Sequence, residues 1–145
     1  MNNRAVMLTL GYAGLLPFYG FLAAAWSLED WPGAISVQGF IIYSLGILCF
    51  LAGTLWGRVQ SFDAPHKARL LVSNGLVLFA VAAVLTAQAW LASLALMTGY
   101  LALLWYEQGA ESLPSWYGVM RRNLTLGVVL AHSLFFTVQS VQMAS

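Results

Sequence analysis

The sequence predicts an all-α protein that crosses a membrane repeatedly. We expect a single bundle of five transmembrane helices, with the N-terminus in the cytoplasm and the C-terminus outside. Three observations predict this fold class. Of the 145 residues, 61% are hydrophobic and 8% are charged, whereas soluble domains carry about 25% charged residues. The apolar residues gather in five stretches, each near the length of about 20 residues that a helix needs to cross a bilayer. Lysine and arginine fall on only one side of these stretches.

The predicted spans follow one another closely and fill the chain: 5–26, 39–56, 70–85, 89–106 and 123–141. Every charged residue lies outside these limits. This segregation is expected of true spans, because a charge at the bilayer centre costs roughly 2.5–3.5 kcal/mol on insertion scales. No room remains for a soluble domain, so we expect residues 1–145 to form one transmembrane domain.

The first span carries Pro17 in its interior. Proline removes the hydrogen bond to the carbonyl of Ala13, and Gly11 and Gly14 loosen the chain just before it. We therefore predict a kink. The kink can serve packing alone, or it can form a hinge or a concave surface for a ligand.

The same segment resembles a signal peptide in one respect, because Arg4, an apolar run and three alanines follow one another. The apolar run is about 21 residues long, against about 7–15 for a signal core. The segment is therefore interpreted as a span. Cleavage after the alanines would leave four spans.

The second span has small residues along one face. Gly39, Gly46 and Gly53 recur every seven residues, and Gly57 forms a GxxxG pair with Gly53. Small residues let helix backbones approach closely in lipid. We interpret this face as a packing surface within the bundle, and a homodimer seam is the alternative.

The third and fourth spans form one apolar run that is too long for a single crossing. Thr86, Ala87 and Gln88 are the one break within it. The sequence therefore predicts a tight helical hairpin at these residues.

The fifth span repeats polar residues every seven positions, at Thr125, His132 and Gln139. His132 lies near mid-membrane, where ionisable side chains usually face the bundle interior and mark function. The alternative is a neutral histidine that hydrogen-bonds to another helix. The predicted partners are Asn74, Tyr12, Tyr19 and Tyr43, and the candidate ligand-binding residues are His132, Tyr43 and Asn74.

The loop before the fifth span predicts a short linker followed by helix. Pro114 suits the first helical position. Trp116, Tyr117, Arg121 and Arg122 would then lie at the cytoplasmic headgroup level. We interpret them as an interfacial anchor, with a docking surface for a partner as the alternative.

The basic residues set the predicted orientation. In a five-span chain, all six lie on the side of the N-terminus: Arg4, Arg58, Lys67, Arg69, Arg121 and Arg122. The first loop, on the other side, carries Glu29 and Asp30. The positive-inside rule therefore places the N-terminus in the cytoplasm.

Several kinds of chemistry lack their sequence signatures. The chain contains no HExxH, no P-loop and no Ser-His-Asp set, and no acidic residue lies within a predicted span. The single cysteine, Cys49, rules out an intramolecular disulfide and a thiolate metal cluster. The net charge of +1 gives no footprint for nucleic acid. We therefore predict no catalytic residues, no metal site and no cofactor, and a protein that is not an enzyme.

Three segments resemble a known family: 10–18 (LGYAGLLPF), 43–57 (YSLGILCFLAGTLWG) and 114–125 (PSWYGVMRRNLT). Together they resemble the small membrane proteins filed as domain of unknown function 3429, a family whose eukaryotic relative is the mitochondrial transmembrane protein 69. In that family a histidine often precedes the tryptophan of the second segment, where this chain has Leu55. The resemblance singles out residues without assigned roles: Gly14, Pro17, Tyr43, Gly53, Trp56, Gly57, Pro114, Trp116, Tyr117, Arg121 and Thr125.

The resemblance implies a multi-pass protein of the bacterial inner membrane or of the mitochondrial inner membrane, with no established activity. We expect the bacterial location, because no transit peptide precedes the first span. The leading hypothesis is a non-enzymatic accessory or assembly protein. It would act through helix contacts with another membrane protein or with a second copy, within the lipid bilayer. The alternative is a binder or carrier of an apolar small molecule (a tetrapyrrole, quinone or lipid). A transporter component is less favoured, because an odd number of helices gives no clean inverted repeat.

Overall fold

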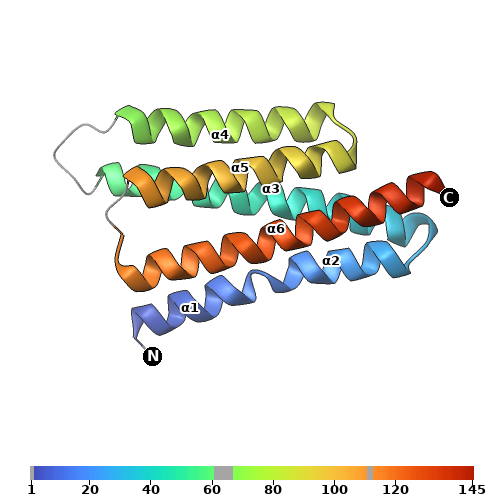
Figure 1. The fold of residues 1–145 in the computed structure, drawn as a ribbon, viewed down its shortest axis with the longest axis horizontal. Coiled ribbons are helices and arrows are strands. Elements are labelled where there is room, and N and C mark those ends of the chain that lie inside the picture. Colours follow the sequence, from blue (N-terminus) through green and yellow to red (C-terminus); the bar gives the residue numbers. More distant parts are fainter. Residues whose placement is uncertain (1, 61–66, 111–112) are drawn as a thin grey trace.

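The computed structural model describes residues 2–60, 67–110 and 113–145, and their regular structure is helical throughout. The helices run roughly side by side along one long axis (Figure 1). Their bounds are α1 Asn3–Ala13, α2 Leu16–Ser27, α3 Asp30–Gln60, α4 Lys67–Thr86, α5 Ala89–Ala110 and α6 Ser115–Ala144. Among the described residues, five segments are long and apolar enough to cross a membrane, with α1 and α2 together forming the first. The predicted all-α, five-span fold class is confirmed, and its orientation stays a prediction.

The first span is divided into two helices, where the sequence predicts only a kink. α1 ends at Ala13, and α2 begins at Leu16 with Pro17 in its first turn. The nitrogen of Leu15 donates to the carbonyl of Tyr12 at 3.1 Å, which tightens the chain into a turn. Because proline cannot donate to the preceding turn, a new helix starts around it.

The hydroxyl of Tyr43 supports this break from the neighbouring helix. It donates to the carbonyl of Gly14 at 2.8 Å. A main-chain carbonyl at membrane depth must find a partner inside the protein. Tyr43 supplies one and joins α3 to the break.

α3 and α6 extend beyond the predicted spans, with 31 and 30 residues. Helices of this length measure about 45 Å, whereas the hydrocarbon core is about 30 Å thick. Hydropathy marks the part of a helix that faces lipid, but the main-chain hydrogen bonds continue past it. The first loop is consequently short, and Asp30, with which α3 begins, adopts a positive φ of 53°.

The third and fourth spans form the hairpin at the residues that the sequence singles out. α4 ends at Thr86 and α5 begins at Ala89. The hydroxyl of Thr86 donates to the carbonyl of Ala82 at 2.7 Å, and the nitrogen of Ala92 donates to the carbonyl of Gln88 at 2.8 Å. These bonds satisfy main-chain and side-chain groups on both sides of the turn.

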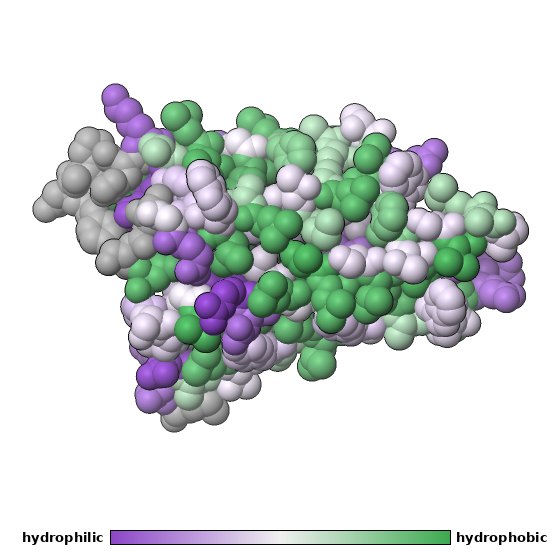
Figure 2. Space-filling view, viewed as in Figure 1, coloured by the Kyte–Doolittle hydropathy of each residue, from purple (hydrophilic) through white to green (hydrophobic). Residues whose placement is uncertain are grey.

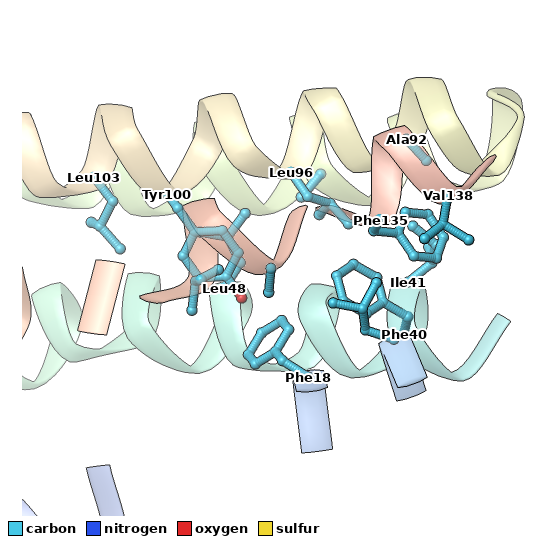
Figure 3. Packing of buried hydrophobic residues seen from close by; sticks show 14 of the residues in the cluster. Phe18, Phe40, Ile41, Leu48, Ala92, Leu96, Tyr100, Leu103, Phe135 and Val138 are labelled. Carbon is cyan, nitrogen blue, oxygen red and sulfur yellow. The ribbon is translucent and has the colours of Figure 1, made fainter. Parts of the chain in front are cut away.

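The core lies where α2, α3, α5 and α6 meet (Figure 3). Phe40 of α3 and Phe135 of α6 stack with their ring centroids 4.2 Å apart. Phe18 of α2 contacts Phe40 edge-on at 5.7 Å. Leu48 and Tyr100, from α3 and α5, extend the same layer, and both are buried.

The outer surface is apolar along most of its length. Figure 2 shows hydrophobic side chains across the middle of the molecule and hydrophilic ones mostly toward its two ends. On α4, Leu71, Leu78 and Leu85 are 72%, 70% and 79% exposed. Exposing such large apolar side chains to water is unfavourable, so we attribute their exposure to contact with lipid.

Of the four predicted packing glycines, Gly39 is the one at which an added Cβ would collide with a described side chain of a neighbouring helix. A Cβ placed on Gly39 would lie 2.5 Å from the ring of Phe21, so close packing of α2 on α3 requires glycine there. A Cβ on Gly46, Gly53 or Gly57 would meet no described atom within 4 Å. Close packing within the bundle therefore requires glycine at position 39, whereas no described side chain requires it at Gly46 or Gly53. The homodimer seam stays a prediction.

Candidate functional site

The imidazole of His132 is held by two serines from two other helices. Its Nε2 lies 2.8 Å from the hydroxyl of Ser44 on α3, and its Nδ1 lies 2.7 Å from the hydroxyl of Ser93 on α5. A neutral imidazole has one donor and one acceptor nitrogen, and two hydroxyls complement both. His132 on α6 therefore joins three helices.

Aromatic rings enclose this group, which we call the His132 clamp (His132, Ser44 and Ser93). Phe40 packs edge-on against the imidazole at 4.9 Å between centroids, and Tyr100 lies at 5.9 Å. The hydroxyl of Tyr100 donates to the carbonyl of Ser44 at 2.7 Å. Since His132 is 1% exposed and both of its nitrogens are engaged, it is placed to stabilise the bundle.

The predicted partners of His132 lie elsewhere, so this part of the sequence interpretation is wrong. Tyr43 donates to Gly14 as described above. Tyr19 donates to the carbonyl of Gly127 at 2.7 Å. The hydroxyl of Tyr12 accepts a bond from Asn123 at 3.3 Å, and Asn74 is exposed on α4. His132, Tyr43 and Asn74 therefore do not form one ligand site.

A buried ion pair lies toward the end of the bundle that holds the N-terminus. The guanidinium of Arg121 donates to the carboxylate of Glu107 through Nε at 2.9 Å and through Nη2 at 3.3 Å. The two side chains are 2% and 0% exposed. The interpretation of Arg121 as a headgroup anchor is therefore wrong, because its charge is buried against α5.

The other predicted anchors do lie at this end, where cations contact aromatic rings. Arg4 of α1 stands over the ring of Trp116 at 5.1 Å. Arg58 of α3 stands over the ring of Tyr117 at 5.7 Å and donates to its hydroxyl at 3.4 Å. α6 begins at Ser115, and Pro114 is its N-cap residue. The sequence predicts Pro114 at the first helical position, which is one residue later in the helix. Cation–π contacts thus connect the start of α6 with α1 and α3.

A cavity of about 500 Å³ separates α1 from α3, with α6 behind it. We call it the α1–α3–α6 cavity. Its apolar lining includes Met7, Leu10 and Gly11 of α1, Ile47, Phe50 and Leu51 of α3, and Met120, Leu124 and Val128 of α6. Leu10 and Phe50 are 67% and 71% exposed, so the cavity reaches the lipid-facing surface between α1 and α3.

The break in the first span creates this space. α2 packs along α3, whereas α1, beyond the break, packs against α6. Gly14 and Leu15, the two residues between the helices, both line the cavity. The divergence of α1 from α3 leaves a gap that no side chain of the described residues fills.

The inner wall of the cavity adjoins the His132 clamp. Phe18 and Tyr100 line the cavity, and their ring centroids lie 6.0 and 5.9 Å from that of His132. The imidazole itself does not line the cavity. A ligand there would touch the rings that pack on the clamp and would leave the imidazole covered.

Arg121 and Thr125 of α6 line the cavity one helical turn apart, and Tyr117 lines it one turn before Arg121. Arg121 is paired with Glu107 as described. Thr125 is 1% exposed, and its hydroxyl oxygen has no hydrogen-bond partner among the residues that the structure describes. Within the same residues, no group of three His, Cys, Asp or Glu side chains could hold one metal ion.

Comparison with protein families decides the relationship of the chain. Residues 3–137 match the family model described as "Protein of unknown function (DUF3429)". The chain belongs to this family. No curated protein matches it, and no solved structure matches it.

The DUF3429 resemblance singled out eleven residues, and the structure brings five of them to one place. The α1–α3–α6 cavity is lined by Gly14, Tyr43, Tyr117, Arg121 and Thr125. These residues come from three separate segments of the chain and have no common spacing. The others do not line this cavity: Pro17, Gly53, Trp56, Gly57, Pro114 and Trp116.

Proposed function

We propose that this protein binds an apolar small molecule of the membrane in the α1–α3–α6 cavity. The observation that carries the proposal is the cavity itself, with a volume of about 500 Å³. Sites for small molecules are concave and mostly apolar, with a few placed polar groups and volumes of about 300–1,000 Å³. The cavity has each of these properties.

The position of the cavity supports entry from the bilayer. Its edges include Leu10 of α1 and Phe50 of α3, which are exposed at the outer surface. A lipid-soluble molecule could pass between the two helices without crossing water. This route favours the binder or carrier alternative over the oligomeric transporter, which would need a path through the membrane.

The test is to fill the cavity with larger side chains on α3 and to measure whether a bound small molecule is lost. Purification in mild detergent, followed by mass spectrometry of bound small molecules, should recover a ligand with the wild-type protein. The double variant Ile47→Trp/Leu51→Trp should lose it, because both residues line the cavity. Leu101→Trp, at an exposed position of α5, should retain it.

Two results would count against the proposal. The first is a wild-type protein that carries no small molecule and is not labelled in the cavity by any photoreactive alkyl probe. The second is a ligand that the double tryptophan variant retains as well as Leu101→Trp does.

A second candidate is an accessory or assembly protein that acts through helix contacts, as the sequence favours. The observation in its favour is the open space at Gly46 and Gly53 on α3, since small residues there would admit another helix. Cross-linking in native membranes should then return a specific partner, and Gly46→Leu/Gly53→Leu should abolish it. A cross-linked partner that is unaffected by these changes would be bound elsewhere.

For its location, we propose a bacterial inner membrane protein with the N-terminus in the cytoplasm. The support is the distribution of charge. The described basic residues lie near the starts of α1, α4 and α6 and the end of α3, all at the end of the bundle that holds the N-terminus. Glu29 and Asp30 lie where α2 ends and α3 begins, and this turn is at the opposite end. The positive-inside rule assigns the first end to the cytoplasm.

A further inference from the structure

We propose that the ligand of the α1–α3–α6 cavity is a neutral amphipathic molecule. It would have one carbonyl or hydroxyl group that faces Arg121 and Thr125 and an apolar tail that lies between α1 and α3. This inference rests on the proposed function and names the chemical class that the cavity selects. Esters, quinones and long-chain alcohols share this chemistry.

The unpartnered hydroxyl of Thr125 calls for a polar group in the ligand. Four other hydroxyls that line the cavity already have a hydrogen-bond partner within the chain. Three of them donate to main-chain carbonyls: Tyr43 to Gly14, Thr54 to Leu51 and Tyr100 to Ser44. The fourth, that of Tyr117, accepts from Arg58. A buried hydroxyl without a partner is costly, so a ligand that hydrogen-bonds to Thr125 gains more than one that does not.

Arg121 offers further donors one turn away from that hydroxyl. A guanidinium carries five N–H donors on three nitrogens. Only Nε and Nη2 of Arg121 are directed at Glu107. The remaining donors suit an oxygen acceptor in the cavity, to which Arg121 contributes lining atoms.

Charge balance at the site favours a neutral ligand over an anion. Glu107 neutralises Arg121 inside the protein, at 0% and 2% exposure. An anionic headgroup on Arg121 would lie close to the buried carboxylate of Glu107. The two negative charges would repel strongly, because the surrounding medium has a low dielectric constant. The exposed Arg122 lies outside the lining, where screening weakens its field.

The apolar remainder of the cavity fits a chain and excludes a large polar body. Its lining runs from the polar pair on α6 to Leu10 of α1 and Phe50 of α3 at the surface. A molecule anchored at Thr125 would therefore direct its tail outward between these two helices. Its length would not be limited, because the tail can continue into the bilayer.

The test uses the full-length protein in lipid nanodiscs and four photoreactive probes. Each probe carries the same diazirine-bearing alkyl chain and ends in a methyl group, a hydroxyl, a methyl ester or a carboxylate. Labelled peptides of α1, α3 and α6 are quantified by mass spectrometry. The alcohol and the ester should label cavity residues about fivefold more than the hydrocarbon, as one net hydrogen bond predicts, and more than the carboxylate.

Matched variants separate the headgroup contact from the shape of the cavity. Thr125→Val keeps the volume and removes the hydroxyl. It should reduce alcohol and ester labelling to the level of the hydrocarbon, and hydrocarbon labelling should stay unchanged. Thr125→Ser, which restores a hydroxyl, should keep the preference. Glu107→Gln should shift the preference toward the carboxylate, because the charge of Arg121 is no longer neutralised.

The outcomes distinguish the inference of a neutral headgroup from the proposed binding of a small molecule in the cavity. Equal labelling by all four probes, or strongest labelling by the carboxylate in the wild-type protein, would overturn the neutral headgroup and leave a binding cavity. If no probe labels the cavity, both proposals fail. A headgroup preference that survives Thr125→Val would remove Thr125 from the site and overturn the inference.

Discussion

Removing the negative charge from the buried Glu107–Arg121 pair should destabilise the bundle more than removing an exposed charge. The change is Glu107→Gln, which keeps the size of the side chain. It leaves Arg121, 2% exposed, as a buried cation without an anion. We expect the free energy of unfolding to fall by about 3–5 kcal/mol, the usual cost of breaking a buried pair from one side.

The magnitude follows from the geometry of the pair. The closest contact, from Nε of Arg121 to the carboxylate of Glu107, is 2.9 Å, and the two charge centres lie about 4 Å apart in such bidentate pairs. At an effective dielectric constant of about 20, unit charges at that distance attract by about 4 kcal/mol. The native protein uses this attraction to offset the cost of taking both groups out of water.

The assay is unfolding by increasing SDS in mixed micelles, followed by tryptophan fluorescence. Arg122→Gln serves as the control, because that side chain is exposed on the same helix, and it should change stability by about 0.5 kcal/mol or less. The double variant Glu107→Leu/Arg121→Met removes both charges and should be as stable as the wild type or more stable. A loss below about 1 kcal/mol for Glu107→Gln, or an equal loss for the double variant, would refute the reasoning.

Three further predictions concern other contacts of the fold. Ser44→Ala and Ser93→Ala should each lower the free energy of unfolding in the same assay by about 1 kcal/mol, the scale of interhelical hydrogen bonds in membranes, and wild-type stability in both would dismiss the clamp. Gly39→Leu should destabilise the protein by more than about 2 kcal/mol by overpacking, whereas Gly53→Leu should leave monomer stability unchanged; equal losses would contradict the packing. A reporter enzyme fused after Gln88 should be active outside the cytoplasm, and cytoplasmic activity would reverse the topology.

Much of the fold can be predicted from the sequence, because the number of membrane spans depends mainly on where the apolar residues lie. Five apolar stretches are enough to predict five spans, since every main-chain polar group in the bilayer must be bonded within a helix. The break at Thr86–Gln88 could be found because the run was too long for one crossing. The ends of α3 and α6 could not, since helical hydrogen bonding continues beyond the apolar part.

The site was harder to predict because it depends on which faces of different helices meet. The sequence predicts that His132 faces the bundle interior, but it does not single out Ser44 and Ser93, because serines are common on packed faces of membrane helices. Glu107 lies directly after the predicted fourth span, which ends at residue 106, so hydropathy gives no indication that its carboxylate is buried. The sequence does contain a weak signal for this pair. Glu107 and Arg121 are opposite charges on either side of a short linker, and two antiparallel helices joined by such a linker can bring them together.

The α1–α3–α6 cavity lies beside the break in the first span. Pro17 ends one helix and starts another, and Tyr43 then secures the exposed carbonyl of Gly14 at 2.8 Å. This contact fixes the break in place, but it leaves α1 turned toward α6 and away from α3. The break, which the hydrogen bond from Tyr43 secures, lies at the wall of the cavity, because Gly14, Leu15 and Tyr43 all line it. Departures from regular local structure are most often found at functional sites. This is the physical reason to look for a ligand there before any other part of the molecule.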